Sequence, residues 1–134
     1  MIGRELSATT GLAEWFLAHR GGRVRGYTHA RFSGLTTAAL AGVLAEVIER
    51  RPALEGLYHV ASEPISKYDL LRKLNEVFGT RTEIEPSGEV RIDRTLDGSR
   101  FDAATGLRPA GWDRMLADMA ADPTPYEEWR RHSV

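Results

Sequence analysis

The chain has no cysteine and very little lysine, and each absence limits its chemistry. Without cysteine it can form no disulfide, no thiolate nucleophile and no cysteine-based zinc site. Of its 18 basic residues only Lys67 and Lys73 are lysine, and the rest are arginine. The net charge of −1 gives no general attraction to nucleic acid or to an anionic membrane, so we expect neither partner.

Long apolar runs are also missing. No stretch approaches the roughly 20 residues needed to span a bilayer. The first ten residues, MIGRELSATT, lack the apolar core of a signal peptide. We therefore expect a cytoplasmic chain. A length of 134 residues with 42% hydrophobic and 28% charged residues is typical of one globular domain, or of part of a larger one.

Motifs that carry chemistry are scarce as well. None of the 13 glycines lies in a G-x-G-x-x-G or G-x-x-G-x-x-G pattern, which brings a dinucleotide pyrophosphate against the start of a helix. The four histidines show no metal-ligand spacing. His59 lies between Tyr58 and Val60, where we expect it to pack in the core. We assign no catalytic, cofactor-binding or metal-ligating residue to this chain.

What is present is a series of helices and short strands. Helical spacing of apolar residues predicts a helix from Thr37 to about Arg50, capped by Thr36 and ended by Pro52. Leu57 to Ala61 predicts a buried strand. After it, Ser66 is typical of an N-cap, Asp69 of a short capping box and Gly79 of a left-handed helix end.

Weaker patterns fill the rest of the chain. A loop is expected from His29 to Leu35. Further helices are predicted over Gly11–His19 (capped by Thr10), over Trp112–Ala121 and after Thr124-Pro125, and further strands over Arg23–Thr28, Thr82–Glu85 and Glu89–Asp93. We predict an α/β fold, α+β as an isolated lobe, in which helices outnumber a few short strands.

Three segments carry a family resemblance. FSGLTTAALA (32–41) is similar to a pattern G-x-P-T-x-x-x-D-L-A, although Leu35 replaces its proline and Ala39 its aspartate. GLYHV (56–60) is similar to G-x-Y-H-V/N, and RTLDGSRF (94–101) to R-x-x-L-D-x-S-K/R-x. In this order they resemble the C-terminal substrate-binding lobe of an extended short-chain dehydrogenase/reductase, of the dTDP-4-dehydrorhamnose reductase and NAD-dependent epimerase/dehydratase type.

The resemblance implies that residues 1–134 are a single, incomplete lobe without the N-terminal Rossmann half. In a whole enzyme of this kind, NAD or NADP exchanges hydride with a nucleotide-activated sugar, and a Tyr-x-x-x-Lys motif acts as acid and base. This chain has neither that motif nor the glycine-rich loop. It has three Tyr-x-x-x-Arg tetrads, at Tyr27/Arg31, Tyr68/Arg72 and Tyr126/Arg130, but arginine is a poor substitute for the lysine.

The same resemblance points to substrate-binding residues. Arg31 and Phe32 fall where such enzymes contact the nucleotide or the sugar, and Arg91 and Arg94 bracket a region that often supplies a second diphosphate-binding arginine. The guanidinium group suits phosphate oxygens, and a phenyl ring can stack on a base. The alternative for each arginine is a solvated surface charge, and for Phe32 a place in the core.

Two functions follow from these observations. The resemblance implies that the chain is the nucleotide-sugar-binding portion of an NAD(P)-dependent sugar-nucleotide oxidoreductase or epimerase, and we expect it not to be catalytic alone and to have no cofactor of its own. The alternative is a non-enzymatic protein-interaction module derived from such a lobe. Besides the nucleotide sugar, the expected partner is either the missing Rossmann half or a second copy.

Overall fold

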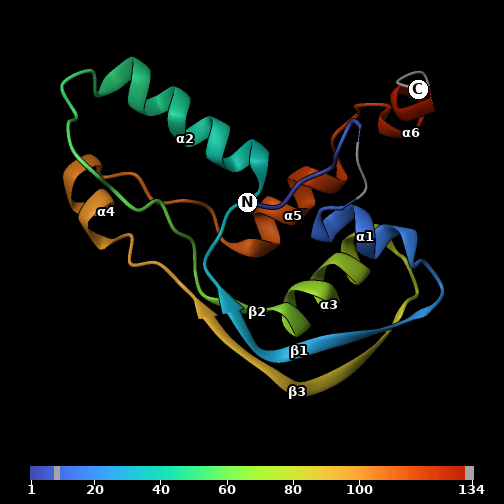
Figure 1. The fold of residues 1–134 in the computed structure, drawn as a ribbon. Coiled ribbons are helices and arrows are strands. Elements are labelled where there is room, and N and C mark those ends of the chain that lie inside the picture. The colour runs from blue at the N-terminus through green and yellow to red at the C-terminus, as the bar shows by residue number, and fades with distance from the viewer. Residues whose placement is uncertain (8–9, 132–134) are drawn as a thin grey trace.

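The computed structural model describes residues 1–7 and 10–131. Figure 1 shows the elements and their arrangement. In chain order they are α1 (Leu12–Ala18), β1 (Arg23–Phe32), α2 (Thr37–Arg50), β2 (Ile65–Ser66), α3 (Lys67–Phe78), β3 (Glu83–Arg94), α4 (Ser99–Thr105), α5 (Trp112–Ala120) and α6 (Tyr126–Arg131). Within the described ranges, helices outnumber strands, which confirms the predicted fold class.

A three-stranded sheet of order β2-β1-β3 forms one side of the molecule. The long strands β1 and β3 are parallel and end together, with Phe32 opposite Arg94, while the short β2 runs antiparallel to β1. The predicted strand from Arg23 continues to Phe32, so the predicted loop over 29–35 is wrong for its first half. Residues 29–32 stay extended because they pair with strand β3. Arg31 and Phe32 pair with strand β2 as well.

Strand β3 joins two segments that the sequence suggested were separate. Residues 83–94 form one strand with a register shift opposite Tyr27 and His29. Pro86 lies inside it, which an edge strand tolerates because one side needs no backbone donor. On the exposed side, Glu83 and Glu85 pair with Arg23, at 3.0 Å each.

Helix α3 has the ends that its sequence predicts. The Ser66 Oγ accepts from the Asp69 N–H at 3.0 Å and donates to the Asp69 carboxylate at 2.6 Å. Gly79 closes the helix in the left-handed region, with φ 57°. The start of the helix lies very close to β1. A Cβ atom added at Gly26 of β1 would lie only 3.0 Å from the Cα of Tyr68. A glycine is therefore required at this contact.

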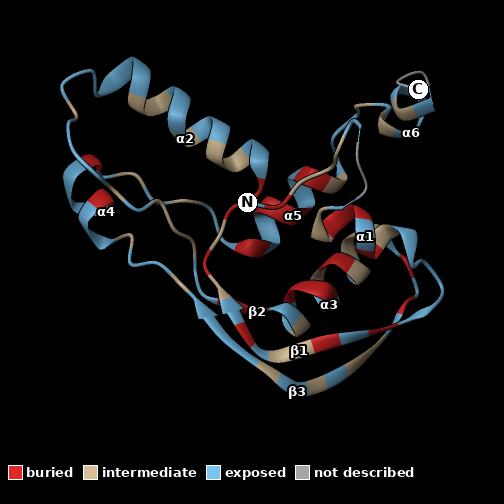
Figure 2. Cartoon of the chain, in the orientation of Figure 1, coloured by how far each residue is buried: buried red, intermediate tan, exposed pale blue. Residues whose placement is uncertain are grey.

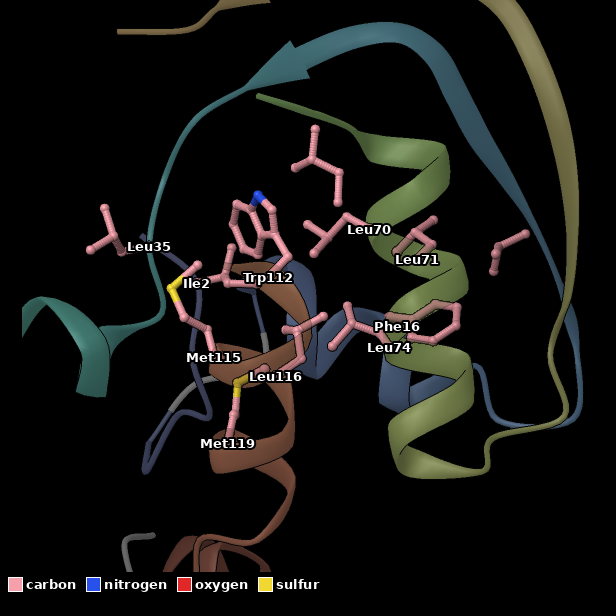
Figure 3. Close-up of a cluster of buried hydrophobic side chains, with 12 residues drawn as sticks. Ile2, Phe16, Leu35, Leu70, Leu71, Leu74, Trp112, Met115, Leu116 and Met119 are labelled. Carbon is pink, nitrogen blue, oxygen red and sulfur yellow. The ribbon is translucent and has the colours of Figure 1, made fainter. Parts of the chain in front are cut away.

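The core lies between α1, α3, α5 and the inner face of the sheet, as Figure 3 shows. Its fully buried centre joins Phe16 of α1 to three leucines of α3 and to two residues of α5; these are Leu70, Leu71, Leu74, Met115 and Leu116. Burial of such side chains contributes roughly 1.5–3 kcal/mol each, which makes this cluster the main source of stability.

A buried ionic cluster connects the two ends of the described chain. Glu14 is 3% exposed, and its carboxylate contacts Arg4 at 2.5 Å and Arg130 of α6 at 3.0 Å. The same carboxylate accepts a hydrogen bond from the Glu5 N–H at 3.1 Å.

The predicted cap of α1 at Thr10 is wrong. Gly11 is the N-cap, and its backbone N–H donates to the Glu5 carboxylate at 3.1 Å.

Two other expectations fail for a shared reason. Residues 57–61 form no strand, since no backbone hydrogen bond joins them to another residue of the described ranges. A strand needs a neighbour with which to pair, and the described residues supply none to this segment. His59 is accordingly exposed, not in the core.

The helix α4 was not predicted; it starts after Asp97, whose carboxylate accepts a hydrogen bond from the Ser99 N–H at 2.9 Å.

Candidate functional site

A pocket of about 470 Å³ opens where β1 and β3 end. Its walls are largely apolar, from both strands, from the start of the chain and from the loop after β3. Its lining includes Ala30, Phe32, Leu35, Leu40, Val60, Ile92 and Leu96. The volume lies within the range of ordinary small-molecule sites, about 300–1,000 Å³.

Three charged side chains line this pocket, and all are cationic: Arg31, Lys67 and Arg94. All three are exposed. Among the described residues none of them makes a side-chain hydrogen bond or an ion pair. By contrast, Arg23 and Arg25 at the other end of β1 are paired with glutamates of β3. The pocket therefore presents positive charge that no protein carboxylate neutralises by direct contact.

The structure brings three of the four predicted site residues together. Arg31, Phe32 and Arg94 line the pocket, and Phe32 faces Arg94 in the strand register. Arg91 does not line it; it is exposed and lies opposite His29, three positions before the end of β3. The ligand-binding roles of these residues stay predictions.

Lys67 is the pocket residue that sequence reasoning missed. It is the first residue of α3 and follows Ser66, which pairs with Arg31 across the sheet. Nothing local marks it as a site residue. Only the antiparallel register of β1 with β2 places it beside Arg31, and a two-residue strand gives no readable pattern in the sequence.

Asp93 is an acidic group that interacts electrostatically with Arg31. Hydrogen bonds from the backbone and side chain of Thr95 lower its pKa, and the charge of Arg31 adds a smaller lowering. The backbone bond, from the Thr95 N–H, measures 2.9 Å. Asp93 thus stays ionised at neutral pH and offsets part of the charge of Arg31.

Phe32 belongs to the pocket and to the core at once. Its ring lies 5.4 Å from the Trp112 ring at an angle of 59°, and the indole N–H donates to the Glu63 carbonyl at 2.8 Å. A ring held in this way supplies a fixed apolar wall. Both readings weighed for Phe32, core packing and ligand contact, are therefore compatible with its position.

Ser33 fixes the loop that closes the pocket. Its hydroxyl is buried, accepts from the Leu96 N–H at 2.7 Å and is 3.3 Å from the Leu96 carbonyl. The next segment is tied in from the other side, because the Ser62 N–H donates to the Ser33 carbonyl at 3.0 Å. Ser33 thus joins the loops after β1 and β3, and its hydroxyl is engaged as a structural group.

The three Tyr-x-x-x-Arg tetrads differ in geometry. Tyr27 and Arg31 lie on a strand, where four residues span about 13 Å. Arg72 lies over the Tyr68 ring at 5.8 Å on α3. The Tyr126 hydroxyl donates to Asp122 at 2.6 Å, and this bond raises the pKa of Tyr126. A catalytic tyrosine of the expected kind needs a lowered pKa, so the third tetrad has the opposite electrostatics.

Metal and membrane features are absent from what the structure describes. Residues 1–7 and 10–131 contain no cluster of histidine and acidic side chains suited to a metal ion, and no helix long and apolar enough to cross a bilayer. His132, one of the four histidines considered above, lies outside these ranges.

Comparison with solved structures identifies the fold. The dTDP-4-dehydrorhamnose reductase of Bacillus anthracis, solved with NADP, matches with a TM-score of 0.73 over 87% of this chain at 13% identity. The chain shares the fold of part of that enzyme. WbmG of Bordetella bronchiseptica, solved with NAD and UDP, matches 96% of the chain with a TM-score of 0.67 at 12% identity. A hypothetical dTDP-4-dehydrorhamnose reductase of Sulfolobus tokodaii matches 78% with a TM-score of 0.59 at 27% identity.

The chain spans well under half the length of these relatives: 44%, 43% and 41% of them respectively. The expected likeness to sugar-nucleotide reductases and dehydratases, as a partial lobe, is thus confirmed at the level of fold. No family model matches the sequence, and no curated protein matches it either.

Proposed function

We propose that the pocket at the end of β1 and β3 binds the diphosphate group of a nucleotide-activated sugar. The observation that carries this proposal is the set of three unpaired cations, Arg31, Lys67 and Arg94, on the rim of an apolar pocket. A nucleoside diphosphate sugar has two anionic phosphates between two bulky rings. Cations that keep no protein partner suit the phosphates, and the apolar wall suits a ring.

In a whole enzyme of this fold, the chain supplies substrate binding and a Rossmann half supplies the cofactor and the acid/base group. Hydride transfer with NAD or NADP is therefore proposed for the complete assembly and not for this chain alone. The lack of cysteine fits a reducing compartment, and we propose a cytoplasmic location. Support comes from the fold shared with NADP- and NAD-containing enzymes.

The test is a calorimetric titration of the full chain with UDP, dTDP and their glucose conjugates. Loss of one charge-assisted contact costs roughly 1.5–3 kcal/mol, which is about a 10- to 150-fold loss of affinity. We expect this loss for Arg31→Ala, Arg94→Ala and Lys67→Ala. Arg20→Ala is the matched control, since Arg20 is exposed and outside the pocket lining.

Arg91→Ala tests the remaining predicted residue. A loss of affinity in this variant extends the site along the exposed side of β3, and an unchanged affinity limits the site to the pocket. If the three pocket variants all bind like the parent, the diphosphate site is not here. Binding that weakens equally in Arg20→Ala points to general charge, and contradicts the proposal as well.

A second function, a non-enzymatic interaction module, has one observation in its favour. Helix α2 has no buried residue among its fourteen, and Leu44, Ile48 and Leu57 are 50%, 74% and 76% exposed. The titration separates the two functions: a chain that binds none of the four nucleotides, yet binds a protein partner, is such a module.

A further inference from the structure

Helix α6 is held in place without burying a side chain. The structure describes all six of its residues and none is buried, and Figure 2 shows it only in the colours of exposed and intermediate residues. Its start is fixed to the preceding turn, where the Asp122 carboxylate accepts from the Tyr126 hydroxyl at 2.6 Å and from the Thr124 N–H at 3.0 Å. A helix this short is not stable by itself, so its position depends on the contacts that it makes.

Ionic contacts join α6 to the segment before α1. Arg130 contacts one carboxylate oxygen of Glu14 at 3.0 Å, and Arg4 contacts the other at 2.5 Å. Arg4 also reaches α6 directly, because its guanidinium lies 3.0 Å from the Glu127 carboxylate and 4.7 Å from the centre of the Tyr126 ring. Arg4 and Glu14 therefore connect α6 with residues 1–5.

One donor is left unsatisfied when α6 lies in this closed position. The Nη2 atom of Arg130 is buried and has no hydrogen-bond partner among the described residues, and its ion pair with Glu127 is 3.7 Å long. A buried donor without a hydrogen bond destabilises the state that buries it. An open position of α6, with Arg130 in water, does not have this cost. The closed state is thus favoured by the ionic contacts and opposed by one of their members.

The segment that α6 holds is part of the pocket wall. Met1, Ile2 and Leu12 line the pocket, whereas no residue of α6 does so. Arg4 follows Ile2 by two positions, and Glu14 follows Leu12 by two. The contact between Arg4 and Glu14 therefore joins the two parts of this wall directly behind the pocket.

We propose that α6 is a strap that regulates the diphosphate pocket through Arg4 and Glu14. With the strap closed, these two residues hold the wall at Ile2 and Leu12. Opening removes Arg130 and Glu127 and exposes the remaining Arg4–Glu14 pair to water, where such a pair contributes little. The wall then loosens. Because ligand binding and closure use the same wall, each favours the other by the same factor. The link to a ligand rests on the proposed function, but the link between the strap and the wall does not.

The first test needs no ligand and follows amide exchange of the full chain by NMR. Arg130→Met removes the charge and keeps an unbranched side chain. We expect exchange in α6, and at the Ile2 N–H that donates to the Leu35 carbonyl at 3.0 Å, to become at least about threefold faster. The Ser62 N–H, which donates to the Ser33 carbonyl at another part of the pocket, should keep its rate. An unchanged Ile2 rate overturns the strap, and equal acceleration at Ser62 overturns it as well, because it indicates a general loss of stability.

Two further variants make this test specific to the ionic contact. Arg131→Met is the matched control, since Arg131 is the next residue of α6 and is exposed. It should leave the Ile2 rate unchanged. Arg130→Lys keeps a positive charge for Glu14 and should bring the Ile2 rate back toward that of the parent. A control that behaves like Arg130→Met, or a lysine variant without any such recovery, contradicts the assignment of the strap to Arg130.

UDP provides the second readout. Saturating UDP should slow exchange in α6 at least about threefold, although α6 does not line the pocket, and Arg130→Met should weaken UDP binding by a similar factor. If UDP binds the parent but neither effect occurs, the strap is overturned and the proposed function stands. If the parent binds no UDP, the proposed function fails together with the regulatory role, and the exchange of Ile2 still decides whether α6 and the wall are coupled.

Discussion

Removal of the Glu14 carboxylate is expected to be the most damaging single change in charge. Glu14 is 3% exposed and contacts both Arg4 and Arg130, which are 14% and 19% exposed. Glu14→Ala leaves two largely buried guanidinium groups with only the exposed carboxylate of Glu127 between them, at 3.0 Å from Arg4 and 3.7 Å from Arg130. Breaking a buried pair in this way costs about 3–5 kcal/mol, against a total stability of about 5–15 kcal/mol for a domain.

The magnitude is checked by thermal and denaturant unfolding beside a matched variant. Glu83→Ala removes an exposed carboxylate from its pair with Arg23, where both side chains are about 60% exposed, and should cost at most about 1 kcal/mol. A loss of 3 kcal/mol lowers Tm by roughly 10 °C for a chain of this size.

A local measurement tests the same reasoning. Because Glu14 holds Arg130, amide exchange in α6 should accelerate in Glu14→Ala and stay unchanged in Glu83→Ala. Equal stability losses in the two variants, or an α6 whose exchange does not respond, would refute the claim that the buried cluster anchors the end of the described chain.

Three smaller predictions concern single groups. Ser66→Ala removes the N-cap of α3 and should cost about 1 kcal/mol by denaturant unfolding; an unchanged midpoint contradicts the cap. Leu116→Ala in the core should cost about 2–5 kcal/mol, and a loss below 1 kcal/mol contradicts the packing. The hydrogen bond to Asp122 raises the pKa of Tyr126 in the fold above its ordinary 10.0, so its stabilising effect is complete below pH 10 and is lost as pH rises through the folded pKa. Tyr126→Phe should remove that alkaline decline, and a decline of equal size in the variant argues against this source.

Sequence reasoning succeeded where a few adjacent residues decide the structure. The cap at Thr36, the cap at Ser66 and the left-handed end at Gly79 depend on local hydrogen bonds and backbone conformation. Such signals lie within four residues of the element that they begin or end, so one sequence contains all the information they need.

Strands were predicted less well because their limits depend on partners far away in the sequence. Strand β1 continues through Phe32 since β2 and β3 pair with that end, and β3 passes through Pro86 since it lies at an edge. Residues 57–61 have a strand-like sequence, but the neighbour that would make them a strand is not among the described residues.

The candidate site also combines residues that the sequence singles out locally with an arrangement that depends on distant strand pairing. The sequence singles out Phe32 as the first residue of a motif, Arg31 as the residue before it, and Arg94 as the start of another motif. Their meeting in one pocket follows from the parallel register of β1 and β3. Lys67 enters through the pairing of Ser66 with Arg31. Arg91, on the same strand as Arg94, lies outside the lining because it is three residues from the strand end.

The central claim is that unpaired cations at the end of the sheet bind a diphosphate. The most direct measurement follows the side-chain Nε–H signals of the arginines by NMR while UDP is added to the full chain. The account predicts saturable shifts for Arg31 and Arg94, none for the exposed Arg20, and no response to uridine, which lacks phosphate. Signals of Arg31 and Arg94 that stay fixed while UDP binds elsewhere, or that respond equally to uridine, would contradict it.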